Sequence, residues 1–140
     1  MINIAILGST GSIGKSTLNI IRKNKKKFKV ILLSANVNGK TLFKQAKEFK
    51  VKNVIILNTE KNKYWIAKFH NKKIRTFDNF LKFSKIFKKK IDHVINGISG
   101  LDGLKPTLDI IKHTNKIAIA NKESIICGWN LILKELNQNN

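Results

Sequence analysis

The sequence is poor in cysteine, proline, arginine and acidic residues. The single cysteine, Cys127, excludes a disulfide within the chain and a cysteine-based metal cluster. The single proline, Pro106, lies inside a predicted helical unit, and no low-complexity stretch marks a linker, so residues 1–140 are predicted to form one domain. No apolar run is long enough to span a bilayer and no secretory leader opens the sequence, which favours a cytoplasmic protein with no membrane partner.

Acidic residues number 8 against 28 basic ones, which gives a formal net charge of +20. A charge of this size raises the alternative of a basic, Rossmann-type nucleic-acid-binding domain. Arginine, the better residue for bidentate phosphate and base recognition, occurs only as Arg22 and Arg75. The lysines are spread from Lys15 to Lys134, and asparagine, isoleucine and phenylalanine are also abundant. We therefore attribute the charge to compositional bias and expect no specific nucleic-acid partner.

Apolar runs of strand length alternate with segments of helical periodicity along the whole chain. This alternation predicts an α/β fold: a doubly wound, mostly parallel sheet of Rossmann type with helices on both faces. Asp78 is the expected N-cap of the fourth helix, whose aromatic residues should face the core, and the last strand is expected to be buried. Strands are expected at 2–7, 28–34, 53–57, 73–77, 93–96 and 116–120, and helices at 12–23, 39–49, 61–70, 79–87, 106–113 and 121–136.

A glycine-rich stretch, Gly8-Ser9-Thr10-Gly11-Ser12-Ile13-Gly14, joins the first strand to the first helix. Glycines let the backbone approach a phosphate group closely, and a helix N-terminus supplies free N–H groups and a positive dipole end. The spacing is GxxGxxG, a variant of the dinucleotide-binding fingerprint GxGxxG. The stretch therefore indicates a nucleotide site, although a tightly packed βα turn without a ligand has the same composition.

Two further observations narrow the class of nucleotide that the stretch would bind. The end of the stretch, Gly14-Lys15-Ser16-Thr17, is similar to a P-loop, but that motif requires glycine where Ser9 stands, and the later strands do not end in a magnesium-binding acid. The second strand also lacks the acid that NAD-binding proteins use for the ribose hydroxyl. Asn36, Asn38 and Lys40 stand there instead and could donate to a 2′-phosphate, which favours NADP, whereas an asparagine-glycine turn without a ligand remains the alternative.

The last predicted strand ends in Asn121-Lys122-Glu123-Ser124. Asn121 as N-cap and Glu123 in the first turn are explained by helix capping. Lys122 is not, because a cation is unfavourable near a helix N-terminus. A lysine at this edge of the sheet suggests an anionic or carbonyl-bearing ligand.

Three segments together resemble the 1-deoxy-D-xylulose 5-phosphate reductoisomerase family over essentially the whole chain. They are the glycine-rich stretch with the preceding Ile6-Leu7, the stretch Gly100-Leu101-Asp102-Gly103-Leu104-Lys105-Pro106-Thr107-Leu108, and the final Ala120-Asn121-Lys122-Glu123-Ser124. The resemblance implies an enzyme of non-mevalonate isoprenoid biosynthesis. Such enzymes rearrange 1-deoxy-D-xylulose 5-phosphate and reduce it with NADPH to 2-C-methyl-D-erythritol 4-phosphate, with a magnesium or manganese ion on the substrate oxygens, as homodimers.

The resemblance also assigns site residues. It implies that the glycine-rich stretch holds the NADPH pyrophosphate, that the segment after the second strand holds the 2′-phosphate end, and that Lys122 contacts the phosphorylated sugar. The cofactor-binding residues are then Gly8, Thr10, Gly11, Ser12, Ile13, Gly14, Asn36, Asn38, Asn121 and Glu123.

The chain departs from the family pattern in two ways. Asn36 and Val37 stand where family members often have glycine and a basic residue, so selectivity for NADP is expected to be weaker or to depend on Lys40. Family members also run much longer, with an Asp-Ser-Glu metal-binding motif just beyond this point. Residues 1–140 are therefore expected to hold the NADPH-binding domain without catalytic or metal-binding residues, and to be inactive alone.

Overall fold

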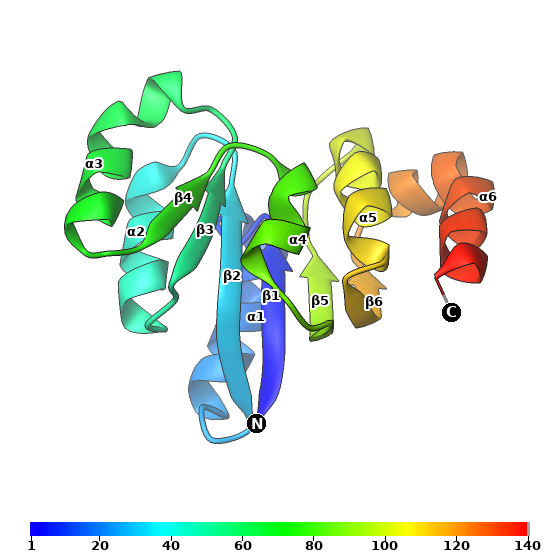
Figure 1. Cartoon of the computed structure of the whole chain (residues 1–140), viewed down its shortest axis with the longest axis horizontal. Coiled ribbons are helices and arrows are strands. Elements are labelled where there is room, and N and C mark those ends of the chain that lie inside the picture. The colour runs from blue at the N-terminus through cyan, green and yellow to red at the C-terminus, as the bar shows by residue number, and fades with distance from the viewer. Residues whose placement is uncertain (140) are drawn as a thin grey trace.

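A computed structural model describes residues 1–139 and contains one six-stranded sheet in the order β4-β3-β2-β1-β5-β6. Every neighbouring pair of strands is parallel (Figure 1). The chain builds outward from β1 to β4 and then returns to add β5 on the other side of β1. This reversal beside β1 is the switch point at which doubly wound folds bind ligands. The strands are β1 (Ile2–Leu7), β2 (Phe28–Ala35), β3 (Asn53–Ile56), β4 (Arg75–Phe77), β5 (Ile91–Asn96) and β6 (Thr114–Ile119).

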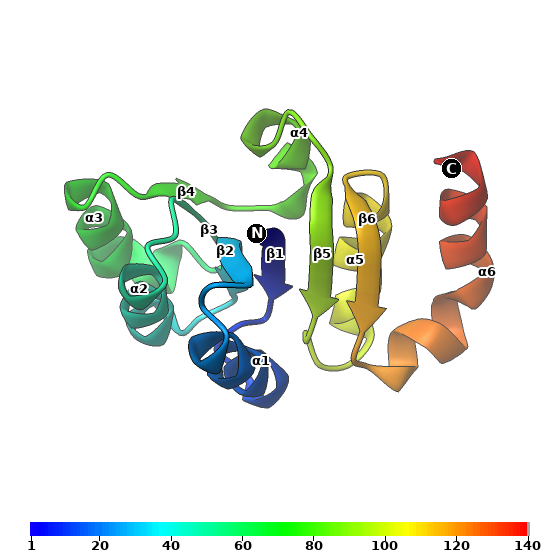
Figure 2. The ribbon, with the colours of Figure 1, turned by 90° about the horizontal axis from the view of Figure 1, so that it is seen from below.

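Within residues 1–139, five α-helices and three short 3₁₀ turns connect the strands on both faces of the sheet, as the alternating pattern predicted, and a sixth helix follows the last strand (Figure 2). Every connection between strands contains a helix, because parallel neighbours need a crossover. The helices are α1 (Ser12–Lys23), α2 (Gly39–Glu48), α3 (Lys63–Asn71), α4 (Phe83–Ile86), α5 (Leu104–Ile111) and α6 (Lys122–Gln138); the 3₁₀ turns are η1 (Glu60–Asn62), η2 (Phe80–Lys82) and η3 (Leu101–Gly103).

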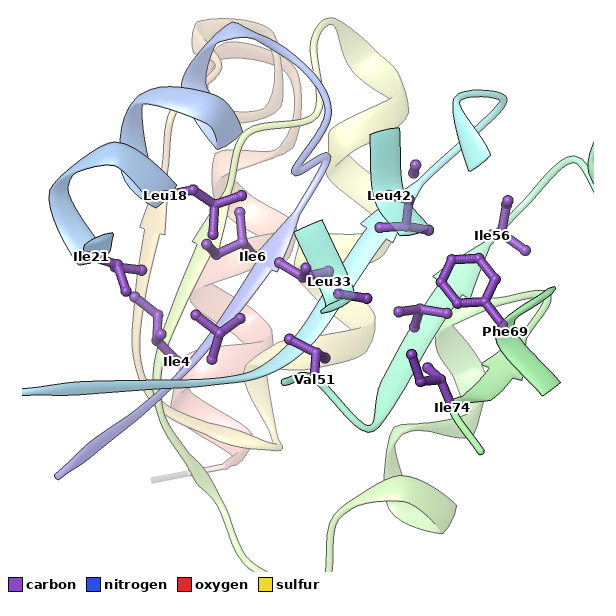
Figure 3. Close-up of a cluster of buried hydrophobic side chains, with 14 residues drawn as sticks. Ile4, Ile6, Leu18, Ile21, Leu33, Leu42, Val51, Ile56, Phe69 and Ile74 are labelled. Atoms are coloured by element: carbon purple, nitrogen blue, oxygen red, sulfur yellow. The ribbon is translucent and has the colours of Figure 1, made fainter. Parts of the chain in front are cut away.

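Two hydrophobic cores lie on opposite faces of the sheet. In the first core, α1, α2 and α3 pack on alternate residues of β1 and β2; Ile6, Leu33 and Phe69 are fully buried there (Figure 3). The second core joins the other residues of the same strands to α4 and α5. Strands buried on both faces explain the continuous apolar runs in the sequence.

The last strand differs from its expectation. It was expected to be buried, but β6 lies at the edge of the sheet, where Lys116 and Ala118 are exposed and Ile117 is half-buried. The helix that follows, α6, packs mainly on α5 and η3 and makes few contacts with β6. The close packing of α6 on α5 requires a glycine at position 128, because an added Cβ there would lie 2.2 Å from Leu104 Cδ1.

The segment 79–87 also departs from its expectation. It is a 3₁₀ turn followed by the four-residue α4 rather than one helix, and its cap is Asn79, whose Oδ1 accepts from Leu81 N at 3.0 Å. Asp78 instead accepts from Lys82 Nζ at 2.9 Å. The aromatic residues Phe80 and Phe83 are buried in the second core, as their spacing predicted. Within residues 1–139, no helix combines the length and apolar character needed to cross a membrane.

Candidate functional site

A cleft of about 610 Å³ opens at the carboxyl edge of the sheet, above the switch point between β1 and β5. The loops that follow β1, β2, β3, β4 and β5 all contribute to it. Of the predicted site residues, Gly8, Thr10, Gly11 and Asn36 line this cleft. The other lining residues are Ser34, Ala35, Leu57, Asn79, Phe80, Leu81, Gly97, Ile98, Ser99, Leu101, Asp102, Lys105, Pro106 and Asp109.

The glycine turn needs its glycines for close packing. Gly8 has φ +72°, a left-handed conformation that favours glycine, and an added Cβ would lie 3.1 Å from Gly97 O. An added Cβ on Gly14 would lie 2.4 Å from Ser9 Cα and 2.5 Å from Gly8 O. The start of α1 therefore lies directly against the turn, and a side chain at Gly14 would push the helix away from it, whereas one at Gly8 would meet the loop after β5.

Ser9, which breaks the P-loop pattern, is a buried structural residue. Its Oγ donates to Gln45 Oε1 at 2.8 Å, and Gln45 Nε2 returns a bond to Ser9 O at 2.9 Å. Ser34 Oγ accepts from Gly8 N at 2.9 Å. These bonds fix the turn to α2 and to the end of β2, so the backbone of the turn is held in one position before any ligand arrives.

The N-terminus of α1 has no side-chain cap. Its N-cap residue is Gly11, and in the described part of the chain no side chain caps the N–H groups of the first turn. The N–H groups of this turn, including those of Ser12 and Ile13, are therefore available to an external acceptor. The Ile13 side chain lies against the loop after β5, because an added Cβ on Gly97 would be 3.1 Å from Ile13 Cβ. This geometry is suited to an anion at the helix terminus.

The segment after β2 is polar, and one of its side chains already caps the helix that follows. Asn38 Oδ1 caps α2 by accepting from Thr41 N at 3.1 Å, which leaves its Nδ2 group to donate elsewhere. Asn36 is exposed beside the cleft, and its carbonyl accepts from Asn58 N at 3.0 Å. No acid follows β2, so a negatively charged group at this edge would meet amide donors rather than a carboxylate.

The start of α6 is tied to the same edge through Asn121. Its Oδ1 accepts from Ser124 N at 2.8 Å, as predicted for an N-cap, and its Nδ2 donates to Ile98 O at 2.8 Å. Lys122 is exposed and Glu123 half-buried in the first turn of α6. Neither lines the 610 Å³ cleft, so the structure brings only part of the predicted set around one cavity and places the α6 residues beside it.

Charged groups at this edge are few. The Lys82 ammonium, by its hydrogen bond, holds the pKa of Asp78 below its ordinary value, so this carboxylate stays ionised well into the acidic range. Asp109 accepts from Lys105 Nζ at 3.0 Å on the wall formed by α5. Among residues 1–139, no three His, Cys, Asp or Glu side chains gather where they could hold a metal ion.

Several lining residues were missed from the sequence. They follow β3, β4 and β5, so applying the carboxyl-edge rule to every strand, rather than to three of them, would have included Leu57, Asn79 and Ser99. The buried bond between Ser9 and Gln45 had no sequence signal, because the two residues lie in different elements. The ligand contacts assigned to the ten predicted cofactor residues and to Lys122 stay predictions.

The sequence model of the 1-deoxy-D-xylulose 5-phosphate reductoisomerase family matches residues 4–128. The chain belongs to this family. The reductoisomerase of Pelagibacter ubique is 56% identical over 142 residues, and that of Persephonella marina is 40% identical over 127 residues. The first match covers 99% of this chain but 36% of the relative, so the chain spans about a third of the length of the curated reductoisomerases that it matches.

Solved structures agree with the family match. The reductoisomerase of Zymomonas mobilis in complex with NADPH matches with a TM-score of 0.86 and 29% identity, over 99% of this chain and 36% of that one. A reductoisomerase in complex with NADPH, fosmidomycin and magnesium matches with a TM-score of 0.85 and 26% identity, over 99% and 35%. These matches confirm the predicted fold class and give no support to the nucleic-acid-binding alternative.

Proposed function

We propose that this chain is the NADPH-binding domain of an enzyme that converts 1-deoxy-D-xylulose 5-phosphate to 2-C-methyl-D-erythritol 4-phosphate in non-mevalonate isoprenoid biosynthesis. The observation that carries the proposal is the uncapped N-terminus of α1, packed against a glycine turn at the switch point of the sheet. A family match over residues 4–128 supports it, as does the likeness to a reductoisomerase solved with NADPH.

The glycine turn would hold the pyrophosphate. The backbone N–H groups of Thr10, Ser12 and Ile13 would donate to the phosphate oxygens, and the positive end of α1 would stabilise their charge. The Gly11 N–H donates to Gly8 O at 3.1 Å, so Gly11 would contact the pyrophosphate by letting it approach without a side chain in the way. Gly8 and Gly14 would act indirectly: Gly14 lets the helix meet the turn without a side chain between them, and Gly8 lets the turn meet the loop after β5 in the same way. The bonds from Ser9 and Ser34 keep this backbone preorganised.

The segment after β2 would select the phosphorylated cofactor. Asn36 and the free Nδ2 of Asn38 would donate to the 2′-phosphate, and Lys40 in the first turn of α2 would supply its counter-charge in place of the basic residue that Val37 replaces. NADH lacks that phosphate, so we expect NADPH to bind more tightly.

The first turn of α6 would form the other rim. Asn121 holds α6 against the loop after β5, Glu123 would contact the cofactor, and Lys122 would bind an oxygen of the phosphorylated sugar. NADPH supplies a hydride when bound. No catalytic residue is assigned within this chain, and because its described residues form no metal cluster, we derive no step through a magnesium or manganese ion.

The remaining parts of the function belong to a longer protein in this proposal. The metal ligands and the C-terminal domain would come from sequence beyond residue 140, and the whole enzyme would be a homodimer. We further infer a cytoplasmic location, because NADPH and sugar phosphates are charged metabolites. Residues 1–140 alone would bind NADPH weakly and would not turn over substrate.

Fluorescence titration of residues 1–140 with NADPH and NADH tests the cofactor site. We expect saturable binding, tighter for NADPH, and a loss of the NADPH preference in Lys40→Gln. A gel shift with random DNA at physiological salt tests the basic-domain alternative. Tight DNA binding without an NADPH signal would refute the proposal, and measurable reductoisomerase turnover by residues 1–140 would refute the predicted inactivity.

A further inference from the structure

A second cleft, of about 460 Å³, opens at the amino edge of the sheet, on the side away from the glycine turn. We call it the lysine cleft. The start of β1, the beginning of β2, the α2–β3 connection and the α4–β5 connection enclose it. Its lining residues are Asn3, Lys29, Val30, Ile31, Lys50, Lys52, Asn53, Ile86, Phe87, Lys88, Lys89 and Lys90.

Half of the lining residues are lysines, and none is acidic. Within residues 1–139, no ion pair joins any of these six lysines to a carboxylate. Two acids lie nearby: Asp92 accepts from the backbone N of the lining residue Asn3 at 2.8 Å, and Glu48 pairs with Arg22. Lys90 Nζ donates to a main-chain oxygen, that of Asn139, at 3.3 Å. The lysine cleft therefore concentrates six lysines that no ion pair within residues 1–139 neutralises, with the single carboxylate of Asp92 beside its wall.

The floor of the lysine cleft is apolar and fixed. Val30 and Ile86 are buried, and Ile31 and Phe87 are half-buried in the second core. Lys50 has φ +54°, and Val51 N donates to Ala46 O at 2.9 Å just after it, so the end of α2 holds the backbone of this lysine in place. A cleft with low-dielectric walls and charge of one sign focuses the electric field toward a ligand.

We propose that the lysine cleft binds a small multivalent phosphate anion, at a site separate from the proposed NADPH site. Lysine ammonium groups bind phosphate as point charges, and the absence of arginine among the lining residues disfavours planar, bidentate recognition of carboxylates or bases. The volume lies within the range of small-molecule pockets, and a concave shape suits a compact anion better than a membrane or a duplex. Inorganic oligophosphate and the phosphate chain of a nucleoside triphosphate share this chemistry.

The test follows backbone amide resonances of residues 1–140 during titration with inorganic tripolyphosphate in about 0.15 M salt, where surface charges are screened beyond about 8 Å. We expect saturable shifts at Lys50, Lys52 and Lys88–Lys90, with little change at Gly8–Gly14. The affinity should fall as salt rises, because the attraction is electrostatic.

Two variants of equal net charge distinguish binding at the lysine cleft from nonspecific binding to a basic surface. Lys50→Gln/Lys52→Gln/Lys89→Gln removes three lysines of the cleft, and we expect it to weaken tripolyphosphate binding at least about tenfold. Lys25→Gln/Lys26→Gln/Lys72→Gln removes three exposed lysines that lie outside the cleft, and we expect a loss below about threefold. Equal losses in both variants, or shifts centred on Gly8–Gly14, would overturn the proposal.

A second arm identifies the source of the phosphate chain. ATP that binds as tightly as tripolyphosphate would show that the phosphate chain alone is recognised. ATP that binds at least about tenfold more tightly would identify a nucleotide site, with its base on Phe87 and Ile31. Duplex DNA or anionic vesicles that bind far more tightly than tripolyphosphate, with equal losses in both lysine variants, would overturn the assignment to a small anion.

Discussion

The two edges of the sheet differ in the charge of their connecting segments. The connections from strand to helix at the carboxyl edge, at residues 8–11, 36–38, 57–59, 78–79, 97–100 and 120–121, contain no lysine or arginine. The connections from helix to strand at the amino edge, at 24–27, 49–52, 72–74, 87–90 and 112–113, each contain lysine and no acid. The arrowheads in Figure 1 mark the first edge, and the strand tails mark the second.

Helix dipoles give this segregation a physical cause. In a parallel α/β fold all helix N-termini lie at the carboxyl edge and all C-termini at the amino edge, where a cation is favourable. A bias toward lysine in the composition would by itself place lysines at both edges. The segregation holds for the connections only, because the first turns of helices that start at the carboxyl edge do contain lysine, as at Lys40 in α2, Lys105 in α5 and Lys122 in α6.

The comparison also separates two ways of attracting an anion. At the carboxyl edge the proposed cofactor site uses backbone N–H groups and amides, held by glycine packing and buried hydrogen bonds. At the amino edge the lysine cleft uses side-chain ammonium groups on an apolar floor. The first depends on backbone position and the second on charge, so substitutions should affect the two edges differently.

The largest effect is expected at Gly14. In Gly14→Ala the new Cβ meets Ser9 Cα at 2.4 Å, so α1 must shift, and we expect a loss of about 1–3 kcal/mol in the free energy of unfolding. NADPH affinity should fall at least about tenfold, because the N–H groups of α1 move with the helix. Urea denaturation and NADPH titration measure the two effects.

Gly11→Ala is the matched control in the same turn. Its added Cβ would lie 3.5 Å from Gly8 O, an ordinary contact, so the cost should stay below about 1 kcal/mol. Equal destabilisation by both substitutions would contradict the explanation by close packing.

A smaller effect is expected at the two asparagine caps. Asn121→Ala removes the cap of α6 and leaves Ile98 O without its donor, and we expect a cost of about 1–3 kcal/mol. Asn38→Ala removes only the bond from Thr41 N at an exposed cap, with an expected cost of about 1 kcal/mol or less. Thermal unfolding of both variants checks the order, and the two costs would be about equal if the bond to Ile98 contributed nothing.

Most of the carboxyl edge could be predicted from the sequence, because its signals are local. The run Ile2–Leu7 followed by glycines defined β1 and the start of α1, and Asn121 lies at the predicted cap. The Ser9–Gln45 bond and the Asn121–Ile98 bond join segments far apart in sequence, so no spacing rule could predict them.

The wrong or missed predictions also concern contacts between residues that no local pattern reveals. The apolar composition of Lys116–Ala120 indicated burial, but burial of β6 depends on whether another element covers that edge, and in residues 1–139 none does so fully. Asp78 and Asn79 are both good caps, and Asp78 is instead paired with Lys82. The lysine cleft was missed because its lysines come from three separate segments.

A smaller effect still should come from charge repulsion at the amino edge. Lys88→Gln/Lys89→Gln should raise the Tm by about 2 °C in 0.01 M salt, because like charges around the lysine cleft repel one another. The gain should disappear in about 0.2 M salt, where the charges are screened. A Tm that is lower than that of the unmodified chain at both salt concentrations would show that these lysines stabilise the fold.

The smallest effect is expected at His113, also at the amino edge. Burial, with a smaller contribution from Lys112, lowers its pKa below the ordinary 6.5, and its ring centroid lies 5.9 Å from that of Phe83. Because the folded state disfavours the charged ring, the stabilisation is present above pH 6.5 and is lost as the pH falls through the lower folded-state pKa.

His113→Asn should therefore flatten the fall in the free energy of unfolding below pH 6.5 by a few tenths of a kcal/mol, since solvent screens a partly exposed ring. Urea denaturation at several pH values measures the slope, and the range from about pH 7.5 to 8.5 serves as the internal control, because the ring is neutral there in both states. An unchanged slope in the variant would assign the acid sensitivity to other groups and would leave the amino edge defined by its lysines alone.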